Sequence, residues 1–359
     1  MKVVCGVKVG NMKDRDADAR GKVGIIEFPI KELGPDEVKI KVAYCSICGS
    51  DPHIVGGAFG LEPPFGLGHE MSGVVVELGS AATKRGLKVG DRVSGNFLHY
   101  CGACRPCLTG NQEYCKHASN QPCMAEYVVW HEAQVVKLPQ GVSLLQGCML
   151  EPLSIGVRIL DRCQMQVGKR VLVSGGGPIG LITCQLFKKF GASSLTLSEP
   201  NPQRRDIAKS IGVEFTINPI EEDLVARGME ITGGDGYDVI VEVSGIPSAA
   251  ESVLKLAAYD AHVLYSAMFS NEYRLPLNLF EYCYNKGVHI TGTYCSHYNF
   301  ERAAQILPSM DFSAFLGEEQ IFAIDDCEQA FAAHLSGKYP KIIIRCNDFE
   351  NEEGGERVL

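Results

Sequence analysis

The sequence predicts a protein of two domains, the first rich in β-strands and the second built from alternating strands and helices. Its 359 residues exceed the ~250–300 at which a single hydrophobic core stops growing. Up to about residue 150, β-branched runs are separated by turns that contain Gly, Pro or Asp, which indicates an antiparallel barrel or sandwich. Beyond that point, strands alternate with helices, which indicates βαβ units around a parallel sheet.

Three segments carry the β-strand signal of the first domain, residues 37–44, 71–78 and 125–139. In each segment, β-branched and apolar residues alternate or run together, as they do in half-buried strands. The stretches between them contain the Gly, Pro and Asp residues that favour tight turns. We therefore expect a β-rich domain over residues 1–154.

The second domain is expected to follow a helix at 151–163, in which Leu153, Val157 and Leu160 recur at helical spacing. The strands expected after this helix cover residues 170–175, 194–199, 214–218, 237–245, 261–268 and 288–294. Helices are expected between them, for example at 179–191, 203–212 and 248–258. We expect an α/β domain over 155–294, and a return of 295–359 to the first domain, because chain ends often lie close together.

Composition argues against several classes of function. The net charge is −9 and no basic run occurs, which disfavours nucleic acid as the main partner. No apolar run approaches the ~20 residues of a membrane helix, and the N-terminal residues lack the apolar segment of a signal peptide. Fifteen cysteines without an export signal suggest metal binding and buried thiols rather than a disulfide framework. We therefore expect a cytoplasmic protein.

A glycine-rich turn follows the strand at 170–175 and opens the next helix. It has the G-x-G-x-x-G pattern of dinucleotide-binding proteins, and an acidic residue ends the next strand, about 20 residues further on. The first glycine permits a tight turn, the second lets the backbone approach a pyrophosphate, and the third lets helix and strand pack closely. A glycine-rich turn without a ligand is the alternative. The cofactor-binding candidates in the turn are Gly175, Gly177, Pro178, Ile179 and Gly180.

The acidic residue is Glu199, and it bears on the choice between NAD and NADP. A carboxylate there would accept hydrogen bonds from the ribose 2′-hydroxyl and would repel a 2′-phosphate, so NAD is favoured. Arg204 and Arg205 follow closely and weaken this preference. Arg204 is a further cofactor-binding candidate, with a solvated helix face as the alternative explanation.

Four cysteines cluster in a C-x2-C-x2-C-x7-C pattern, at Cys101, Cys104, Cys107 and Cys115. Four thiolates on one loop can enclose a zinc ion tetrahedrally, as in structural zinc sites. An iron–sulfur cluster is the alternative, but no second cysteine set or electron-transfer domain is evident. A four-ligand site has no open position for substrate, so this zinc would hold a lobe of irregular chain over about residues 96–116.

Six motifs follow one another along the chain: "CGSDPH", "GLGHE", "KVGDRV", the four-cysteine lobe, "LEPLSIG" and "SGGGPIG". The whole chain resembles the zinc-dependent medium-chain dehydrogenases, and "LEPLSIG" resembles their sorbitol, polyol and butanediol dehydrogenase branch. The resemblance implies a GroES-like β-barrel catalytic domain with an inserted Rossmann dinucleotide-binding domain. It also implies a homodimer or homotetramer and two zinc ions per subunit, one catalytic and one structural.

The implied activity is reversible oxidation of a secondary alcohol, such as a polyol, diol or sugar alcohol, to a ketone, with hydride transfer to NAD(P)+. A threonine or amino-alcohol 3-dehydrogenase of the same fold is the alternative. Some members of the superfamily bind a cofactor without zinc chemistry, so a structural cofactor-binding protein is a third possibility. The candidate ligands for a catalytic zinc are present, which favours catalysis.

The resemblance assigns the catalytic zinc ligands to Cys48, His69, Glu70 and Glu151. Glu70 has an alternative role as a carboxylate that does not bind the zinc but orients one of its ligands. Glu151 could bind the zinc directly or through a water. Three further residues take their roles from the same motifs: Asp51 hydrogen-bonds the ligand histidine, Ser50 contacts the substrate hydroxyl, and His53 passes the proton towards solvent.

Two stretches need separate comment. Cys45 forms a C-x-x-C with Cys48, but a redox pair of this kind belongs in a βαβ setting, so we expect Cys45 to be a buried thiol. The expected substrate loop contains Cys295, Ser296 and His297. Related sorbitol dehydrogenases carry an arginine and a tyrosine near this loop, which puts sorbitol itself in doubt as the substrate.

Overall fold

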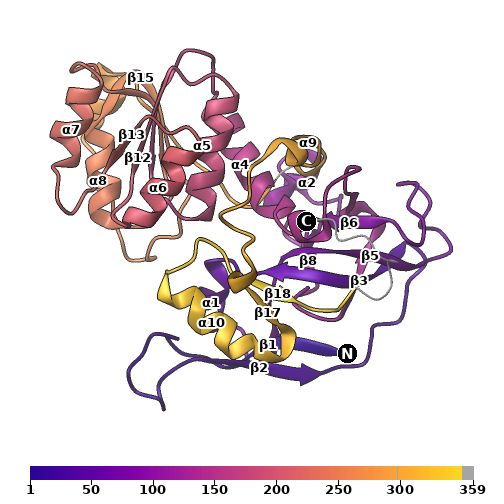
Figure 1. Cartoon of the computed structure of the whole chain (residues 1–359). Helices are drawn as coiled ribbons and strands as arrows, with labels where there is room; N and C mark the ends of the chain where they lie inside the picture. The colour runs from indigo at the N-terminus through magenta and orange to yellow at the C-terminus, as the bar shows by residue number, and fades with distance from the viewer. Residues whose placement is uncertain (297, 350–359) are drawn as a thin grey trace. The chain divides into compact units, whose positions relative to one another are not determined.

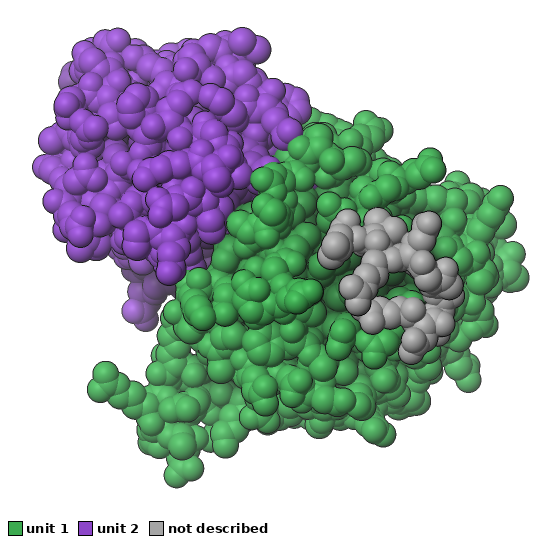
Figure 2. Space-filling view, viewed as in Figure 1, with its two compact units in different colours: residues 1–151, 296–359 green, residues 152–295 purple. Residues whose placement is uncertain are grey.

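The computed structural model describes residues 1–296 and 298–349. The chain divides into two compact units, which Figure 2 shows in different colours. Unit 1 comprises Met1–Glu151 and Ser296–Leu359, and unit 2 comprises Pro152–Cys295. The domain boundaries expected from the sequence follow residues 154 and 294, close to these limits. Among the described residues, no helix is both long enough and apolar enough to cross a membrane.

A seven-stranded sheet forms the framework of unit 1, and its strand β3 (Glu37–Ser46) pairs with three others. Its antiparallel partners are β5 (Glu70–Leu78), β9 (Tyr127–His131) and β18 (Ile343–Arg345). The sheet also contains β6 (Arg92–Gly95), β10 (Val135–Lys137) and β17 (Ile321–Ala323). Strand β18, from the C-terminal segment, thus pairs directly with a strand of the β-rich part of the chain.

The alternation expected in β3 is present, since Val38, Ile40 and Val42 are fully buried while Lys39 and Lys41 are not. The segment 125–139 forms two strands rather than one, because a 3-10 turn at Glu132–Gln134 separates β9 from β10. A second sheet contains β1 (Lys2–Lys8), β2 (Lys22–Glu27) and β4 (Phe65–Gly66). The C-terminal helix α10 (Cys327–Ser336) packs on β2 (Figure 1).

Unit 1 also contains shorter elements. They are α1 (Ser50–Val55), β7 (Leu98–His99), α2 (Arg105–Leu108), β8 (Ser119–Asn120), α3 (Leu144–Gly147) and α9 (Phe300–Ile306). Helix α1 begins where β3 has ended, and the pair β7–β8 stands at the base of the four-cysteine lobe.

A six-stranded parallel sheet forms unit 2, with the order β13-β12-β11-β14-β15-β16. Its strands are β11 (Arg170–Ser174), β12 (Ser194–Ser198), β13 (Phe215–Ile217), β14 (Tyr237–Glu242), β15 (Ala257–Tyr265) and β16 (His289–Gly292). Helices flank the strands in Figure 1: α4 (Leu150–Arg162), α5 (Pro178–Lys189), α6 (Pro202–Ser210), α7 (Leu224–Ile231) and α8 (Pro247–Lys255). The inner strands are buried almost throughout, as expected of a parallel sheet covered on both faces.

Candidate metal centre and dinucleotide pocket

Three potential metal ligands from neighbouring elements converge in unit 1. Cys48 lies between β3 and α1, His69 directly precedes β5, and Glu70 is the first residue of β5. The Cys48 sulfur, a ring nitrogen of His69 and a carboxylate oxygen of Glu70 all lie within 4.8 Å of one another. Thiolate, imidazole and carboxylate are the ligands that zinc accepts in proteins, so the donor set fits a zinc ion.

Asp51 is buried beside this cluster and contacts the backbone of the two segments that carry Cys48 and His69. Its carboxylate accepts hydrogen bonds from the Cys48 N–H at 2.8 Å and the Gly68 N–H at 3.4 Å. Its distance to His69 Nδ1 is 3.7 Å, so this contact is an electrostatic pairing rather than the expected hydrogen bond. Burial lowers the pKa of His69, but the Cys48 and Asp51 charges outweigh this effect and raise it. The ring of Phe97, which the sequence did not single out, packs 5.0 Å from that of His69.

Glu70 is paired with a lysine that was not expected at the site. The Lys341 ammonium contacts the Glu70 carboxylate, and these side chains are only 2% and 1% exposed. Ser46 also donates a hydrogen bond to Glu70. Burial raises the pKa of Glu70, but the charges of Lys341 and His69 and the hydrogen bonds from Lys341 and Ser46 together outweigh burial and lower it. The only sequence signal for Lys341 is a lone cation directly before the apolar run that becomes β18.

The other residues assigned to the catalytic centre also belong to unit 1. Glu151 is buried in the first turn of α4, and burial raises its pKa to about 7. It is not among the three ligands that converge, although the charges of His69 and Glu70 act on it. Ser50 opens α1 and is partly buried, whereas His53 is exposed on the same helix.

The expected substrate loop is described only in part. Cys295 is partly buried, ends unit 2 and has a φ of +48°, in the left-handed region that is rare for residues other than glycine. Ser296 is buried, and its carbonyl oxygen accepts a hydrogen bond from the Tyr100 hydroxyl at 3.3 Å. The third residue of the loop, His297, lies outside the described residues.

The four cysteines of the lobe form a compact cluster of free thiols. Sulfur–sulfur distances are 3.5 Å between Cys104 and Cys107, 3.5 Å between Cys101 and Cys115, and 3.8 Å between Cys104 and Cys115. Backbone N–H groups point at the sulfurs, and hydrogen bonds from the backbone lower the pKa of Cys104 to about 6. Four convergent sulfurs fit the tetrahedral coordination of a structural zinc ion.

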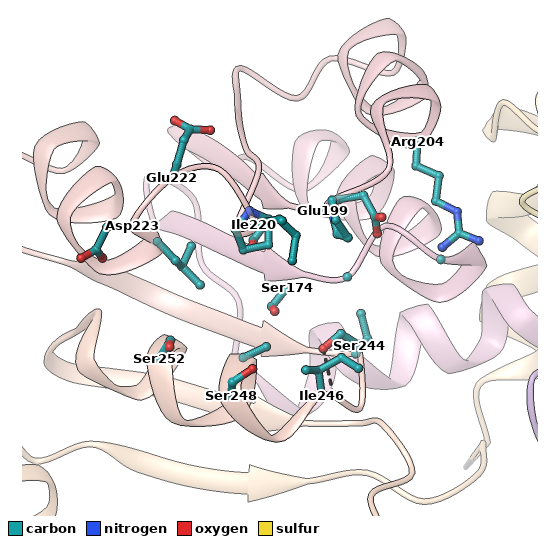
Figure 3. Close-up of a pocket in the computed structure, with 18 residues that line it drawn as sticks. Ser174, Glu199, Arg204, Ile220, Glu222, Asp223, Ser244, Ile246, Ser248 and Ser252 are labelled. Atoms are coloured by element: carbon teal, nitrogen blue, oxygen red, sulfur yellow. Dashed lines mark hydrogen bonds between the residues drawn. The ribbon is translucent and has the colours of Figure 1, made fainter.

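A cavity of about 570 Å³ opens at the glycine-rich turn of unit 2 (Figure 3). Gly175 has a φ of +105°, and a Cβ atom there would lie 2.9 Å from the Ser244 nitrogen. A Cβ atom on Gly180 would lie 1.8 Å from the Gly175 oxygen, so only glycine fits at the strand–helix crossing. Pro178 and Ile179 form the first turn of α5, whose N-terminus follows Gly177 in the cavity wall.

Glu199 lies in the wall of this cavity and is 4% exposed. Its carboxylate accepts hydrogen bonds from the backbone N–H groups of Gly176 at 2.6 Å and Asn201 at 2.8 Å. Arg204, on α6, lines the cavity beside Glu199, as Figure 3 shows. Arg205 instead donates hydrogen bonds to the carbonyl oxygens of Glu199 and Pro200, so its guanidinium stabilises the backbone of this turn.

Comparisons with known proteins agree with this architecture. Residues 34–140 match the family model of the alcohol dehydrogenase GroES-like domain, and residues 178–309 match that of zinc-binding dehydrogenase. L-threonine 3-dehydrogenase of Pyrococcus furiosus is 35% identical over 263 residues, which are 71% of this chain and 75% of that protein. Sorbitol dehydrogenase of Halalkalibacterium halodurans is 31% identical over 332 residues, which are 90% and 96% of the two chains.

A solved structure extends the similarity to three dimensions. A zinc-binding dehydrogenase from Sinorhizobium meliloti bound to NADP superposes with a TM-score of 0.84 and 25% sequence identity. The match covers 96% of this chain and 99% of that one. Together with the two family models, it confirms the expected fold class, a GroES-like domain with an inserted Rossmann domain.

Proposed function

The chain belongs to the zinc-binding dehydrogenases with an alcohol dehydrogenase GroES-like domain, and from this premise we propose that it oxidises a secondary alcohol reversibly to a ketone. The hydride passes to NAD(P)+. The observation that carries the proposal is the convergence of the Cys48, His69 and Glu70 ligand atoms within 4.8 Å. A cofactor-binding protein without chemistry has no use for this convergent donor set.

In this proposal, the residues of unit 1 bind the metal, hold its ligands in place and transfer the proton. A zinc ion bound at Cys48, His69 and Glu70 supplies a Lewis acid that favours loss of the proton from the alcohol. Asp51 keeps the ligand segments in place through its bonds to the backbone around Cys48 and Gly68. Ser50 takes the proton from the substrate hydroxyl and His53, exposed on α1, releases it to solvent. Glu151 is the remaining carboxylate candidate, as a ligand or through a water.

The residues of unit 2 bind the nicotinamide cofactor, which accepts the hydride from the alcohol carbon. The glycine turn and the N-terminus of α5 take the phosphates. We propose that NAD is preferred over NADP, because Glu199 places a carboxylate in the cavity wall. Arg204, in the same wall, reduces that preference.

The substrate class is proposed from the relatives and from the loop sequence. A polyol, diol or sugar alcohol fits the sorbitol dehydrogenase relative, whereas an amino alcohol such as threonine fits the Pyrococcus relative. Cys295, Ser296 and His297 are the proposed substrate-loop residues.

We propose a homodimer or homotetramer with two zinc ions per subunit, the second held by the four-cysteine lobe. Strand β16 is at the edge of the unit 2 sheet and is largely exposed, so this edge could pair with another copy. Phe280 and Tyr284, which precede β16 in the chain, are 70% and 82% exposed, an unusual position for such residues in a monomer.

The formation of NADH or NADPH with a panel of alcohols tests the proposed function. The panel contains sorbitol and other polyols, a butanediol and L-threonine, each measured before and after treatment with a zinc chelator. We expect turnover with at least one secondary alcohol and its loss after chelation. No turnover with any alcohol would favour the cofactor-binding protein instead.

A further inference from the structure

Glu242 is a buried carboxylate that the proposed mechanism does not use. It ends β14, between β11 and β15 in the middle of the unit 2 sheet, and its exposed fraction is 0%. The preceding residues Val239, Ile240 and Val241 are apolar and equally buried. Burying an ionised carboxylate is costly unless several donors compensate for the lost water. A carboxylate at the end of such a strand therefore requires hydrogen-bond donors close to it.

The donors that compensate Glu242 come mainly from the loop that follows it. Its carboxylate accepts hydrogen bonds from the Ser244 N–H at 2.9 Å, the Ser244 hydroxyl and the Gly245 N–H at 3.3 Å. Ser174, the neighbour of Glu242 on β11, is a further donor. Burial raises the pKa of Glu242, and these hydrogen bonds act in the opposite direction. A single side chain thus fixes the backbone of residues 244 and 245.

This loop forms part of the wall of the dinucleotide pocket. Val243, Ser244 and Ile246 line the cavity, and Figure 3 shows Ser244 and Ile246 on the side that also carries Ser248 and Ser252 of α8. The Ser244 hydroxyl accepts a hydrogen bond from the Ile246 N–H at 3.2 Å, directly before α8 begins. The carboxylate therefore holds the loop and, through Ser244, the entry to the helix.

The same loop also contacts the glycine turn. A Cβ atom on Gly175 would lie 2.9 Å from the Ser244 nitrogen and 3.0 Å from its Cα, so the two backbones are packed tightly. A shift of Ser244 would therefore change the space beside the first glycine of the motif. Glu242 is not itself in the cavity wall, and its carboxylate acts on the wall through Ser244, Gly245 and Ser174.

We infer that Glu242 is a positioning residue for the cofactor: its carboxylate holds loop 243–245 against Gly175 and so keeps the dinucleotide pocket in its binding shape. The inference rests on the proposed function, since it assumes that NAD(P)+ occupies this cavity. Glutamine offers only one acceptor oxygen, and its NH2 group would face one of the N–H donors of the loop, so it cannot satisfy all the donors that the carboxylate does. The loop would then be free to move in the unliganded protein, and binding would have to order it.

The test compares Glu242→Gln with Glu251→Gln. Glu251 is on α8 but outside the cavity wall, where it accepts a hydrogen bond from Tyr273. Calorimetric titration of NAD+ and NADP+ should give a Kd about tenfold higher for Glu242→Gln, as expected when about 1.4 kcal/mol of binding free energy is lost. The KM for the cofactor should rise in parallel. The kcat at saturating cofactor and the KM for the alcohol should stay within twofold of wild type, whereas a general loss of structure would lower kcat as well.

Each outcome has a defined meaning. A Kd of Glu242→Gln within twofold of wild type, with the same result for Ser244→Ala, would overturn the inference. If Glu242→Gln does not fold, Ser244→Ala decides by the same criterion, because it removes the hydroxyl bonds and leaves the carboxylate in place; we expect its Kd to rise about threefold. A wild-type protein that binds neither dinucleotide would instead reject the proposed function, and the inference with it.

Discussion

At the scale of single residues, the candidate metal centre contains a buried ion pair between Lys341 and Glu70. Both side chains are almost fully removed from water, and the lysine charge also acts on Cys48 and Glu151. Breaking a buried pair leaves one charge without compensation, which commonly costs more than the pair contributes when intact. Lys341 is therefore as important to this site as the predicted ligands.

Replacement of Lys341 by methionine should lower the free energy of unfolding of the zinc-free protein by about 3–5 kcal/mol. The matched control is Lys39→Met, which removes a surface pair with the half-exposed Glu77 and should cost less than about 1 kcal/mol. Urea unfolding of both variants gives the comparison. Equal losses in the two variants would mean that the Lys341–Glu70 pair does not behave as a buried one.

Glu199 sets the proposed cofactor preference. In Glu199→Ser, the carboxylate that repels a 2′-phosphate is gone and Arg204 remains in the cavity wall, so kcat/KM with NADP+ should rise relative to NAD+ by about tenfold or more. Steady-state kinetics with both cofactors measure the ratio. A wild-type enzyme that already prefers NADP+ would show that Glu199 was interpreted wrongly.

Site residues that belong to a contiguous motif could be predicted from the sequence, whereas site residues that come from distant strands could not. Cys48, His69 and Glu70 lie in short motifs, and the structure brings their ligand atoms together. Lys341, Ser46 and Phe97 belong to no such pattern, because tertiary pairing of distant strands brings them to the cluster.

Cys45 shows the opposite case, in which sequence proximity to the site is misleading. It is fully buried, and its sulfur lies 3.9 Å from that of Cys123 rather than among the ligand atoms. Cys45 is on β3, whereas Cys48 lies beyond the end of this strand, in the turn into α1. This agrees with the packed thiol expected from the sequence.

At the scale of elements, the six strands of unit 2 could be predicted because buried parallel strands have nearly continuous apolar runs, but the start of β15 was wrong: it begins at Ala257, within the segment 248–258 that was expected to be helical. The break between β9 and β10 was missed, since residues 125–139 have apolar and β-branched residues on both sides of it. The break becomes visible only in side-chain hydrogen bonds. The His131 ring accepts from the Ala133 N–H at 3.1 Å, and the Gln134 side chain accepts from the His131 N–H at 3.0 Å.

The pairing of β14 with β11 has a pH-dependent component. The Asp238 carboxylate accepts hydrogen bonds from the Arg170 N–H at 2.8 Å and from its guanidinium at 3.3 Å. Burial raises the pKa of Asp238, but its bonds to Arg170 outweigh burial and lower it. A lowered folded-state pKa means that the stabilisation is complete above the unfolded value of about 3.9 and is lost as the pH falls through the folded-state pKa.

Asp238→Asn should therefore destabilise the protein at pH ~7 by about 1–2 kcal/mol, and the difference from wild type should shrink below pH ~4. Urea midpoints across this pH range measure the effect. Asp206→Asn is the control, because its pair with Lys209 is exposed, and it should change the midpoint little at any pH. A difference that persists unchanged at acid pH would contradict the assigned role of the carboxylate.

The four-cysteine lobe is expected to be a separate structural module. Cys107→Ser removes one of four convergent sulfurs, so the variant should contain one zinc ion fewer per subunit and melt about 5 °C lower or more. Its affinity for NAD+ should be unchanged, because the pocket lies in unit 2. An unchanged zinc content would show that the lobe does not hold the second ion.

At the scale of the whole molecule, the two units carry different parts of the proposed chemistry. Unit 1 contains both groups of potential metal ligands that occur among the described residues, and unit 2 contains the dinucleotide pocket. Metal binding and cofactor binding should therefore be separable by mutation.

The most direct test of the account is the zinc content of Cys48→Ala, measured together with its turnover and its affinity for NAD+. Wild type should contain two zinc ions per subunit. The variant should contain one, lose turnover with the alcohol that wild type oxidises, and bind NAD+ with unchanged affinity. A wild type with a single zinc ion, or a variant with near-normal turnover, would contradict the assignment of Cys48, His69 and Glu70 as the catalytic zinc centre.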